Sequence, residues 1–175
     1  MSLNVTSTGF ALEDIPVLYT GDGRNISPPL QWTTGPRGTR SYALIMDDPD
    51  GPRGTWVHWV AWNLRDTRLA QDIARQPHVE TAGGRLCQGR NSFGRFGYAG
   101  PCPPTGTHRY FFKVYALDRE LDLGPDTTRR ALLEALQGHV LDHGELMVTY
   151  SHARALAARQ MDPDADIRVA PPVRH

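Results

Sequence analysis

Three segments of the chain show the period-of-two side-chain alternation that extended strands impose. They cover residues 40–48, 56–64 and 108–117, and each is rich in aromatic, β-branched and large aliphatic side chains. The loops between them are rich in glycine and proline, and the 175 residues include 17 glycines and 14 prolines. This content is ordinary for strands joined by turns and high for a helical protein. The pattern predicts a mainly β fold built on an antiparallel sheet or sandwich.

Alternation also predicts which side chains share a face of each strand. In the second segment it places His58 on the same face as Trp62 and on the face opposite to Trp59. In the third segment it places His108 and Tyr110 on one face. Each histidine is therefore expected on a strand face lined by large apolar or aromatic side chains.

The helices are expected late in the chain. One helix is predicted to begin near Asp126 and to carry Leu136 and Val140 at helical spacing. Residues 145–150 predict a further strand, and residues 151–160 a short alanine-rich helix. Helices in these positions would lie at the periphery of the sheet.

The chain length predicts a single domain over residues 1–160. The prolines and the lack of an apolar period predict a loosely held tail over residues 161–175. The N-terminal residues lack the basic start and apolar core of a signal peptide, and no run of about 18 apolar residues occurs. These features predict a soluble, cytoplasmic protein that is not an integral membrane protein. Cys87 and Cys102 are interpreted as reduced thiols rather than as a disulfide.

The charged residues balance, with 19 basic and 19 acidic side chains and a net charge of zero. The chain has no excess of positive charge to attract nucleic acid or an anionic membrane, so nucleic-acid binding is not expected. Eighteen of the basic residues are arginines, and Lys113 is the exception. Arg109 is expected to pair with Asp50 or Asp118, and the other seventeen arginines are interpreted as surface residues or as a feature of the composition.

Three polar residues lie at or near strands whose neighbours are apolar. They are Asp48, His58 and His108, from the three predicted strands. A single histidine on an apolar face is usually a core residue whose hydrogen bonds are satisfied. All three could converge on one site if their strands belong to one sheet.

Metal binding and nucleophilic catalysis fit this trio poorly, and no metal, cofactor or catalytic residue is predicted. Two histidines and a carboxylate can form an iron-binding facial triad, but Asp48 and His58 are ten residues apart across a turn. Cys102 lies between prolines, and Pro103 has no backbone N–H to offer an oxyanion hole.

Anion binding fits better. Imidazole N–H groups and loop amides can surround a phosphate, while a carboxylate orients one ring and selects its tautomer. A carboxylate alone would repel an anion. It is compatible with anion binding if it faces a histidine, or if the ligand also carries an amine or hydroxyl. A headgroup that bears both a phosphate and an amine meets both conditions.

Four motifs, in order, resemble the phosphatidylethanolamine-binding proteins, and most closely their bacterial Raf-kinase-inhibitor-like branch. The resemblance spans about residues 5–153. Its motifs are Asp48-Pro49-Asp50-Gly51-Pro52, Trp56-Val57-His58-Trp59, Gly97-Tyr98-Ala99-Gly100-Pro101-Cys102-Pro103-Pro104 and Gly106-Thr107-His108-Arg109-Tyr110.

The resemblance implies an antiparallel β-sandwich with a few peripheral C-terminal helices and a small anion pocket at one end. It also implies cis X-Pro peptide bonds in the first and third motifs. The pocket positions that match this sequence are Asp48, Trp56, His58, Gly100, Pro101, His108 and Tyr110.

Three functional hypotheses follow. The first is a binding protein for phosphate-bearing anions of the phosphoethanolamine type, with modulation of a kinase or protease implied by the resemblance. The second is a hydrolase that cleaves a phosphate ester with the same Asp48, His58 and His108. The third is an interaction module with a vestigial pocket, forming a homodimer through an exposed sheet face.

Overall fold

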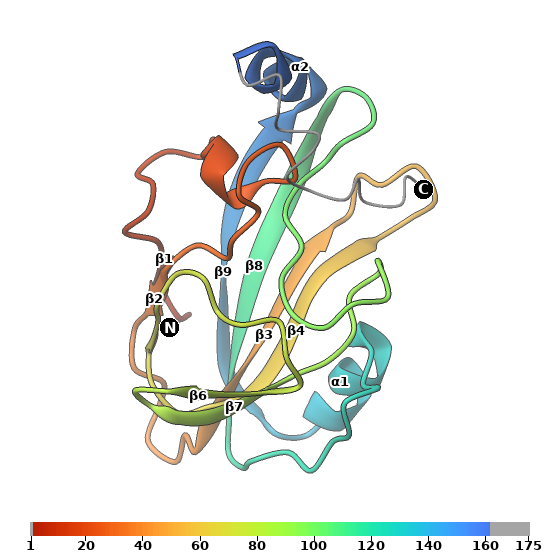
Figure 1. Cartoon of the computed structure of the whole chain (residues 1–175). Helices are drawn as coiled ribbons and strands as arrows, with labels where there is room; N and C mark the ends of the chain where they lie inside the picture. The colour runs from red at the N-terminus through yellow and green to blue at the C-terminus, as the bar shows by residue number, and fades with distance from the viewer. Residues whose placement is uncertain (1, 162–175) are drawn as a thin grey trace.

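The structure, a computed structural model, describes residues 2–161 and consists of two antiparallel sheets with peripheral helices (Figure 1). A three-stranded sheet has the order β1-β2-β5, and a six-stranded sheet has the order β6-β7-β4-β3-β8-β9. The strands are β1 (Val5–Thr6), β2 (Leu30–Trp32), β3 (Ser41–Asp48), β4 (Trp56–Leu64), β5 (Arg68–Leu69), β6 (His78–Thr81), β7 (Gly84–Gln88), β8 (Thr107–Leu117) and β9 (Val140–Ser151). The helical elements are the short 3-10 helix η1 (Val17–Tyr19), α1 (Arg129–Leu136) and α2 (His152–Met161).

The three strands expected from side-chain alternation form the centre of the large sheet. β4 has the predicted bounds, β3 starts one residue later than predicted, and β8 starts one residue earlier. β3 pairs with both β4 and β8, antiparallel in each case. The predicted mainly β, antiparallel sandwich is therefore confirmed.

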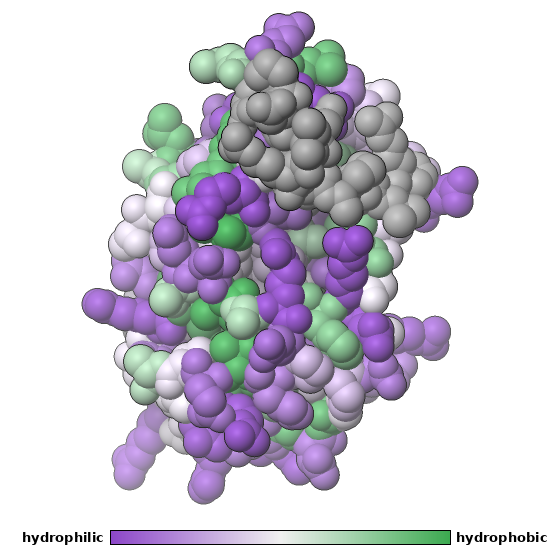
Figure 2. Space-filling model, viewed as in Figure 1, coloured by the Kyte–Doolittle hydropathy of each residue, from purple (hydrophilic) through white to green (hydrophobic). Residues whose placement is uncertain are grey.

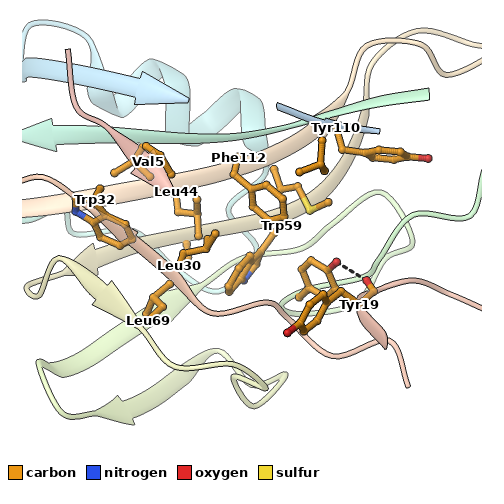
Figure 3. Packing of buried hydrophobic residues seen from close by; sticks show 14 of the residues in the cluster. Val5, Tyr19, Leu30, Trp32, Leu44, Trp59, Leu69, Tyr110 and Phe112 are labelled. Carbon is orange, nitrogen blue, oxygen red and sulfur yellow. Dashed lines mark hydrogen bonds between the residues drawn. The ribbon is translucent and has the colours of Figure 1, made fainter. Parts of the chain in front are cut away.

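The main hydrophobic core lies between the two sheets. Figure 3 shows Leu30 and Leu69 of the small sheet facing Leu44, Trp59 and Phe112 of the large sheet. A second cluster covers the opposite face of the large sheet beneath α1 and the segment before it. Its buried members are Ala43, Ile45, Val60, Trp62, Leu117, Leu121, Leu132 and Leu136.

A β-bulge in β4 changes the face on which His58 lies. Met46 of β3 pairs with Trp59, but the next residue, Asp47, pairs with Val57, so His58 is an extra residue in its strand. Val57 then packs with the cluster beneath α1, the cluster to which Trp62 belongs. The prediction that His58 shares the face of Trp62 is wrong, because one extra residue reverses the alternation.

The first α-helix begins later than the sequence predicted. Thr128, not Asp126, is its N-cap, and the Thr128 side chain accepts a hydrogen bond from the backbone N–H of Ala131. The helix ends at Leu136, and Val140 is the first residue of β9 rather than part of the helix. β9 is consequently twice as long as the predicted strand, because it pairs with β8 from end to end.

The two main helices lie at opposite ends of the long β8–β9 pair (Figure 1). α2 follows β9 directly and covers residues 152–161, so it starts and ends one residue later than predicted. The predicted loose tail, apart from Met161, lies outside the described residues. Among residues 2–161, no helix is both long enough and apolar enough to span a membrane.

Two further expectations concern covalent geometry. No peptide bond in the described part of the chain is cis, so the cis X-Pro bonds implied by the family resemblance are not found. Cys87 and Cys102 are not joined by a disulfide.

Candidate functional site

Asp48, His58 and His108 meet at one end of the large sheet. Asp48 ends β3, whereas His58 and His108 lie at the starts of β4 and β8, and both of these strands run antiparallel to β3. The end of one strand and the beginnings of its two neighbours therefore come together. The bulge in β4 completes the cluster, because it turns His58 toward Tyr110, a residue of the core between the sheets.

A direct hydrogen bond joins Asp48 and His108. The Nδ1 atom of His108 lies 2.6 Å from Oδ2 of Asp48, and the two residues are only 7% and 4% exposed. Oδ1 of Asp48 accepts a second hydrogen bond, from the backbone N–H of Asp50 at 2.7 Å. Burial raises the pKa of the Asp48 carboxyl above its usual range, while the hydrogen bond from His108 opposes this rise.

His58 is oriented by backbone instead of by a carboxylate. Its Nδ1 atom lies 2.5 Å from the carbonyl oxygen of Ala99, and its own carbonyl accepts a hydrogen bond from the Ala99 N–H at 3.0 Å. Because a carbonyl oxygen only accepts, Nδ1 of His58 carries the proton. In both histidines Nδ1 is thus engaged, and a ligand contact from either ring would go through Nε2.

The ring of Tyr110 contacts both imidazoles. Its centroid lies 5.3 Å from that of His58 in an edge-on arrangement and 6.4 Å from that of His108 in a stacked arrangement. The residue is 1% exposed, and burial raises the pKa of its hydroxyl far above the usual range. The side chain is therefore a neutral phenol, and its ring packs against both histidines.

Trp56 joins the cluster through Phe93, a residue that the sequence analysis did not single out. The Phe93 ring lies edge-on to Trp56 at 5.3 Å and edge-on to His58 at 5.8 Å. Trp56 also pairs with Asp48 across the β3–β4 ladder. The indole and the phenyl ring form an aromatic wall beside His58.

The loop that carries Gly100 and Pro101 packs tightly against the N-terminal segment. The N–H of Gly100 donates to Oδ1 of Asn25 at 2.7 Å, and the carbonyl of Pro101 accepts from the N–H of Gly21 at 2.9 Å. A Cβ at position 100 would lie 2.2 Å from the carbonyl oxygen of Tyr19. Only glycine fits there, and this close approach places Ala99 against His58.

Asn91 organises the preceding loop and was also missed by the sequence analysis. This buried side chain donates from Nδ2 to the carbonyl of Gly97, and its Oδ1 accepts from the N–H groups of Phe93 and Arg95. An asparagine inside a glycine-rich loop was a signal that could have identified it, because such side chains commonly replace backbone hydrogen bonds in turns. Asn91 thereby fixes the position of Phe93.

Arg109 pairs with Asp50, one of the two partners that the sequence suggested. The Asp50 carboxylate accepts hydrogen bonds from the Arg109 backbone N–H, Nε and Nη2, each at 2.9 Å. These contacts lower the pKa of Asp50 to about 2. Arg109 therefore ties the loop after β3 to the start of β8.

Two arginines form ion pairs with buried carboxylates. Arg129 and Arg159 each reach a carboxylate that is 1% exposed, on Asp47 and Asp22 respectively, at 2.9 Å. Buried carboxylates need such partners because desolvation disfavours their charge. Arg129 and Arg159 are therefore partly exposed arginines with a structural role that the interpretation by surface position or composition did not include.

The seven predicted pocket residues thus lie in one region. Asp48 and His108 are hydrogen-bonded, Tyr110 contacts both histidines, Trp56 reaches His58 through Phe93, and Gly100 and Pro101 follow the residue that holds His58. Among residues 2–161, no group of three or more His, Cys, Asp or Glu side chains is placed to hold a metal ion. The arrangement offers two oriented imidazoles, one carboxylate and an aromatic ring.

The two antiparallel sheets and their shared core place the chain in the class of β-sandwich proteins. The family model for the phosphatidylethanolamine-binding proteins matches residues 6–151. The chain belongs to the phosphatidylethanolamine-binding protein family, as its motifs suggested. Membership supports a binding protein in general terms and does not specify a ligand.

Similar proteins occur in archaea and bacteria. A UPF0098 protein of Pyrococcus horikoshii is 46% identical over 153 residues, which are 86% of this chain and 77% of that protein. Another UPF0098 protein, from Methanothermobacter thermautotrophicus, is 47% identical over 78% of this chain and 89% of its own length.

Two solved structures share both fold and sequence with this chain. The structure of a phosphatidylethanolamine-binding protein homologue of Chlamydia trachomatis has a TM-score of 0.76 and 38% identity, and the match covers 86% of this chain and 97% of that one. YbcL of E. coli, described as a member of the mammalian family, has a TM-score of 0.78 and 30% identity, over 86% and 99% of the two chains.

Proposed function

We propose that this protein binds a small phosphate-bearing anion, of the phosphoethanolamine type, between His58 and His108. The observation that carries the proposal is the buried Asp48–His108 hydrogen bond of 2.6 Å. A carboxylate facing Nδ1 selects the tautomer of the ring and stabilises its imidazolium form. An imidazolium can donate from Nε2 to a phosphate oxygen, which makes a charge-assisted hydrogen bond.

The carboxylate itself is shielded from a bound anion. Both oxygens of Asp48 are engaged within the protein, one by His108 and the other by the N–H of Asp50. Repulsion between this carboxylate and a phosphate is therefore reduced. This supports a role for Asp48 in positioning His108 rather than in contacting the phosphate.

The second histidine supports the same chemistry from the other side of the Tyr110 ring. Because the Ala99 carbonyl holds the proton on Nδ1 of His58, this ring would also address a ligand through Nε2. The low exposure of His58, His108 and Tyr110 suits a compact headgroup better than acyl chains.

Calorimetric titration of the full chain tests the proposal. Phosphate and phosphoethanolamine are the ligands, and ethanolamine is the control that lacks the phosphate. We expect both phosphate compounds to bind the wild type between His58 and His108, His108→Ala to lose binding at this site, and His143→Ala, at an exposed histidine of β9, to leave it unchanged. A wild type that binds neither phosphate compound would refute the proposal.

A phosphoesterase assay on the same proteins separates binding from catalysis. With an aryl phosphate ester as substrate, a binding protein should show no turnover above that of His108→Ala. Turnover in the wild type that disappears in His108→Ala, but not in His143→Ala, would instead identify a hydrolase.

Protein partners and self-association extend the proposal through the family resemblance. We include a kinase or protease that responds to the occupied site, and a homodimer formed through an exposed sheet face. The side of the molecule in Figure 2 shows only small apolar patches separated by polar side chains, whereas Val140 and Leu141 at the start of β9 are about 40% exposed. Light scattering of the wild type and of Leu141→Glu tests the dimer: a monomeric wild type would exclude it.

A further inference from the structure

A second histidine–aspartate pair lies at the opposite end of the large sheet. Nδ1 of His139 lies 2.9 Å from Oδ1 of Asp118, and the backbone N–H of Asp118 donates to the His139 carbonyl at 3.1 Å. As with His108, a carboxylate engages Nδ1 and leaves Nε2 for a ligand. Unlike His108, this histidine is about one-third exposed and reaches solvent.

Three chain segments bring this pair together beside α1. Asp118 follows the end of β8, Arg40 precedes β3, and His139 lies between α1 and β9. The backbone N–H of Arg40 donates to Leu117 at 2.8 Å, and the His139 N–H donates to Leu136 at 3.0 Å. Backbone hydrogen bonds at the edge of the sheet and at the helix terminus therefore hold the pair in place.

A surface depression of about 890 Å³ opens at this point. It is lined by Arg40, Asp118, Arg119, Glu120 and His139. The hydroxyl of Ser41 donates to the carbonyl of Arg119 at 2.6 Å, which holds the backbone of the loop after β8 against the start of β3. The lining residues thus come from fixed positions around one hollow.

The two carboxylates that line the depression have side-chain partners, whereas its two arginines have no acidic partner in the described part of the chain. Glu120 is neutralised by Arg65, whose Nε lies 2.5 Å from its carboxylate, and Asp118 is engaged by His139. Arg119 donates from Nε to a backbone carbonyl, and within residues 2–161 neither Arg40 nor Arg119 meets a carboxylate within ion-pair distance. Two guanidinium groups therefore remain without an acidic partner, although the whole chain has no net charge.

We propose that this depression binds a dianionic small molecule, a phosphate ester or a dicarboxylate, through Arg40 and Arg119. The planar guanidinium presents its donors as a fork that matches phosphate and carboxylate oxygens. His139 supplies a further donor through Nε2, in the ring orientation that Asp118 imposes. The depression is open to solvent, so it can accept the anionic group of a molecule larger than an inorganic phosphate.

This site is separate from the one between His58 and His108. The residues of β3 that bound the two sites, Ser41 and Asp48, lie at opposite ends of the strand, about 23 Å apart at the rise of an extended chain. No side chain is shared between the two sites. Each can therefore be tested while the other is disabled.

Assigned NMR spectra of the full chain, titrated with inorganic phosphate and with succinate, test the proposal. We expect saturable shifts at Arg40, Arg119 and His139 with a Kd of about 10 mM or tighter. These shifts should persist in His108→Ala, which removes the other site. They should weaken by about tenfold or more in the double variant Arg40→Gln with Arg119→Gln.

The matched control is Arg37→Gln, which removes an exposed arginine three residues before Arg40 that does not line the depression. This variant should retain the affinity of the wild type. The proposal is overturned if the shifts do not saturate, if the double variant leaves them unchanged, or if Arg37→Gln weakens them equally. Loss of the shifts in His108→Ala would also overturn it, because the anion would then belong to the other site.

Discussion

The Nδ1 atom of His108 and Oδ2 of Asp48 lie 2.6 Å apart, although 60 residues separate them in the chain. Both side chains are buried at the point where β3 ends and β8 begins. The contact joins two neighbouring strands of the large sheet at the candidate site. It also couples the orientation of one imidazole to the ionisation of one carboxyl.

Asp48→Asn should weaken phosphate binding by about tenfold while the protein stays folded. An amide can accept the His108 hydrogen bond but supplies no negative charge to stabilise the imidazolium, and hydrogen bonds to charged groups are worth about 1.5–3 kcal/mol. Calorimetry with phosphate measures the change. Asp122→Asn, at an exposed carboxylate, is the control and should bind as the wild type does. Equal affinities for wild type and Asp48→Asn would contradict this role.

The stability cost of Asp48→Asn should be smaller at neutral pH than in acid. Burial raises the folded-state pKa of Asp48 above its ordinary value of 3.8, so the contribution of this carboxyl to stability is fully present below 3.8 and is lost as the pH rises through the folded pKa. Urea unfolding of both proteins between about pH 4 and pH 7 gives the difference in the free energy of unfolding. A difference that grows with pH would show that the sign is wrong.

Asp50→Asn should show the opposite dependence on pH. The Arg109 guanidinium and backbone N–H lower the pKa of Asp50 to about 2, so its contribution is present above pH 3.8 and is lost as the pH falls toward 2. Because both side chains are partly exposed, we expect a loss of about 1 kcal/mol at pH 7. Thermal unfolding at several pH values should show this loss shrinking in acid, and Asp122→Asn should show no such trend.

Gly100→Ala should destabilise the fold by about 1–3 kcal/mol, the usual cost of overpacking. The new methyl group would lie 2.2 Å from the Tyr19 carbonyl oxygen and 2.7 Å from Oδ1 of Asn25. Gly124→Ala is the matched control, since a Cβ there meets no atom within 4 Å. Chemical denaturation of the two variants measures the contrast, and equal midpoints would show that the loop gives way at no cost.

Arg159→Met should lower the free energy of unfolding by about 2–3 kcal/mol. It removes the guanidinium from Asp22, whose carboxylate would keep Tyr150 as its other side-chain hydrogen-bond donor in a buried position. The control is Arg130→Met, which breaks an exposed pair with Glu134 on α1 and should cost less than about 0.5 kcal/mol. Similar unfolding midpoints for the two variants would assign Arg159 to the surface after all.

The central strands of the fold could be predicted because their side chains repeat with a clear period. The bounds of β3, β4 and β8 agree with the alternation to within one residue. Short elements could not be predicted, because β1 and β5 have two residues each and carry no measurable period. Val140 was assigned to the wrong element because its apolar side chain fits a helical spacing as well as the strand that pairs with β8.

Residues that act through local hydrogen bonds were harder to find. Asn91 and Phe93 belong to a loop with no periodic pattern, and their importance depends on which backbone groups come within reach. The partners of Arg159 and Arg129 were equally hidden, since a charged side chain gives no indication in sequence of which carboxylate it will meet.

The sequence by itself determined the three strands β3, β4 and β8 and the three polar residues near their ends. Only the tertiary structure decided that His58 belongs with His108. Strict alternation would have pointed the His58 side chain to the face of Trp62, away from Tyr110, and the bulge at this residue reversed it. The reason is geometric: side chains alternate with a period of two, so one unpaired residue moves a side chain to the other face. The bulged residue is held by the loop around Ala99, which lies some forty residues further along the chain.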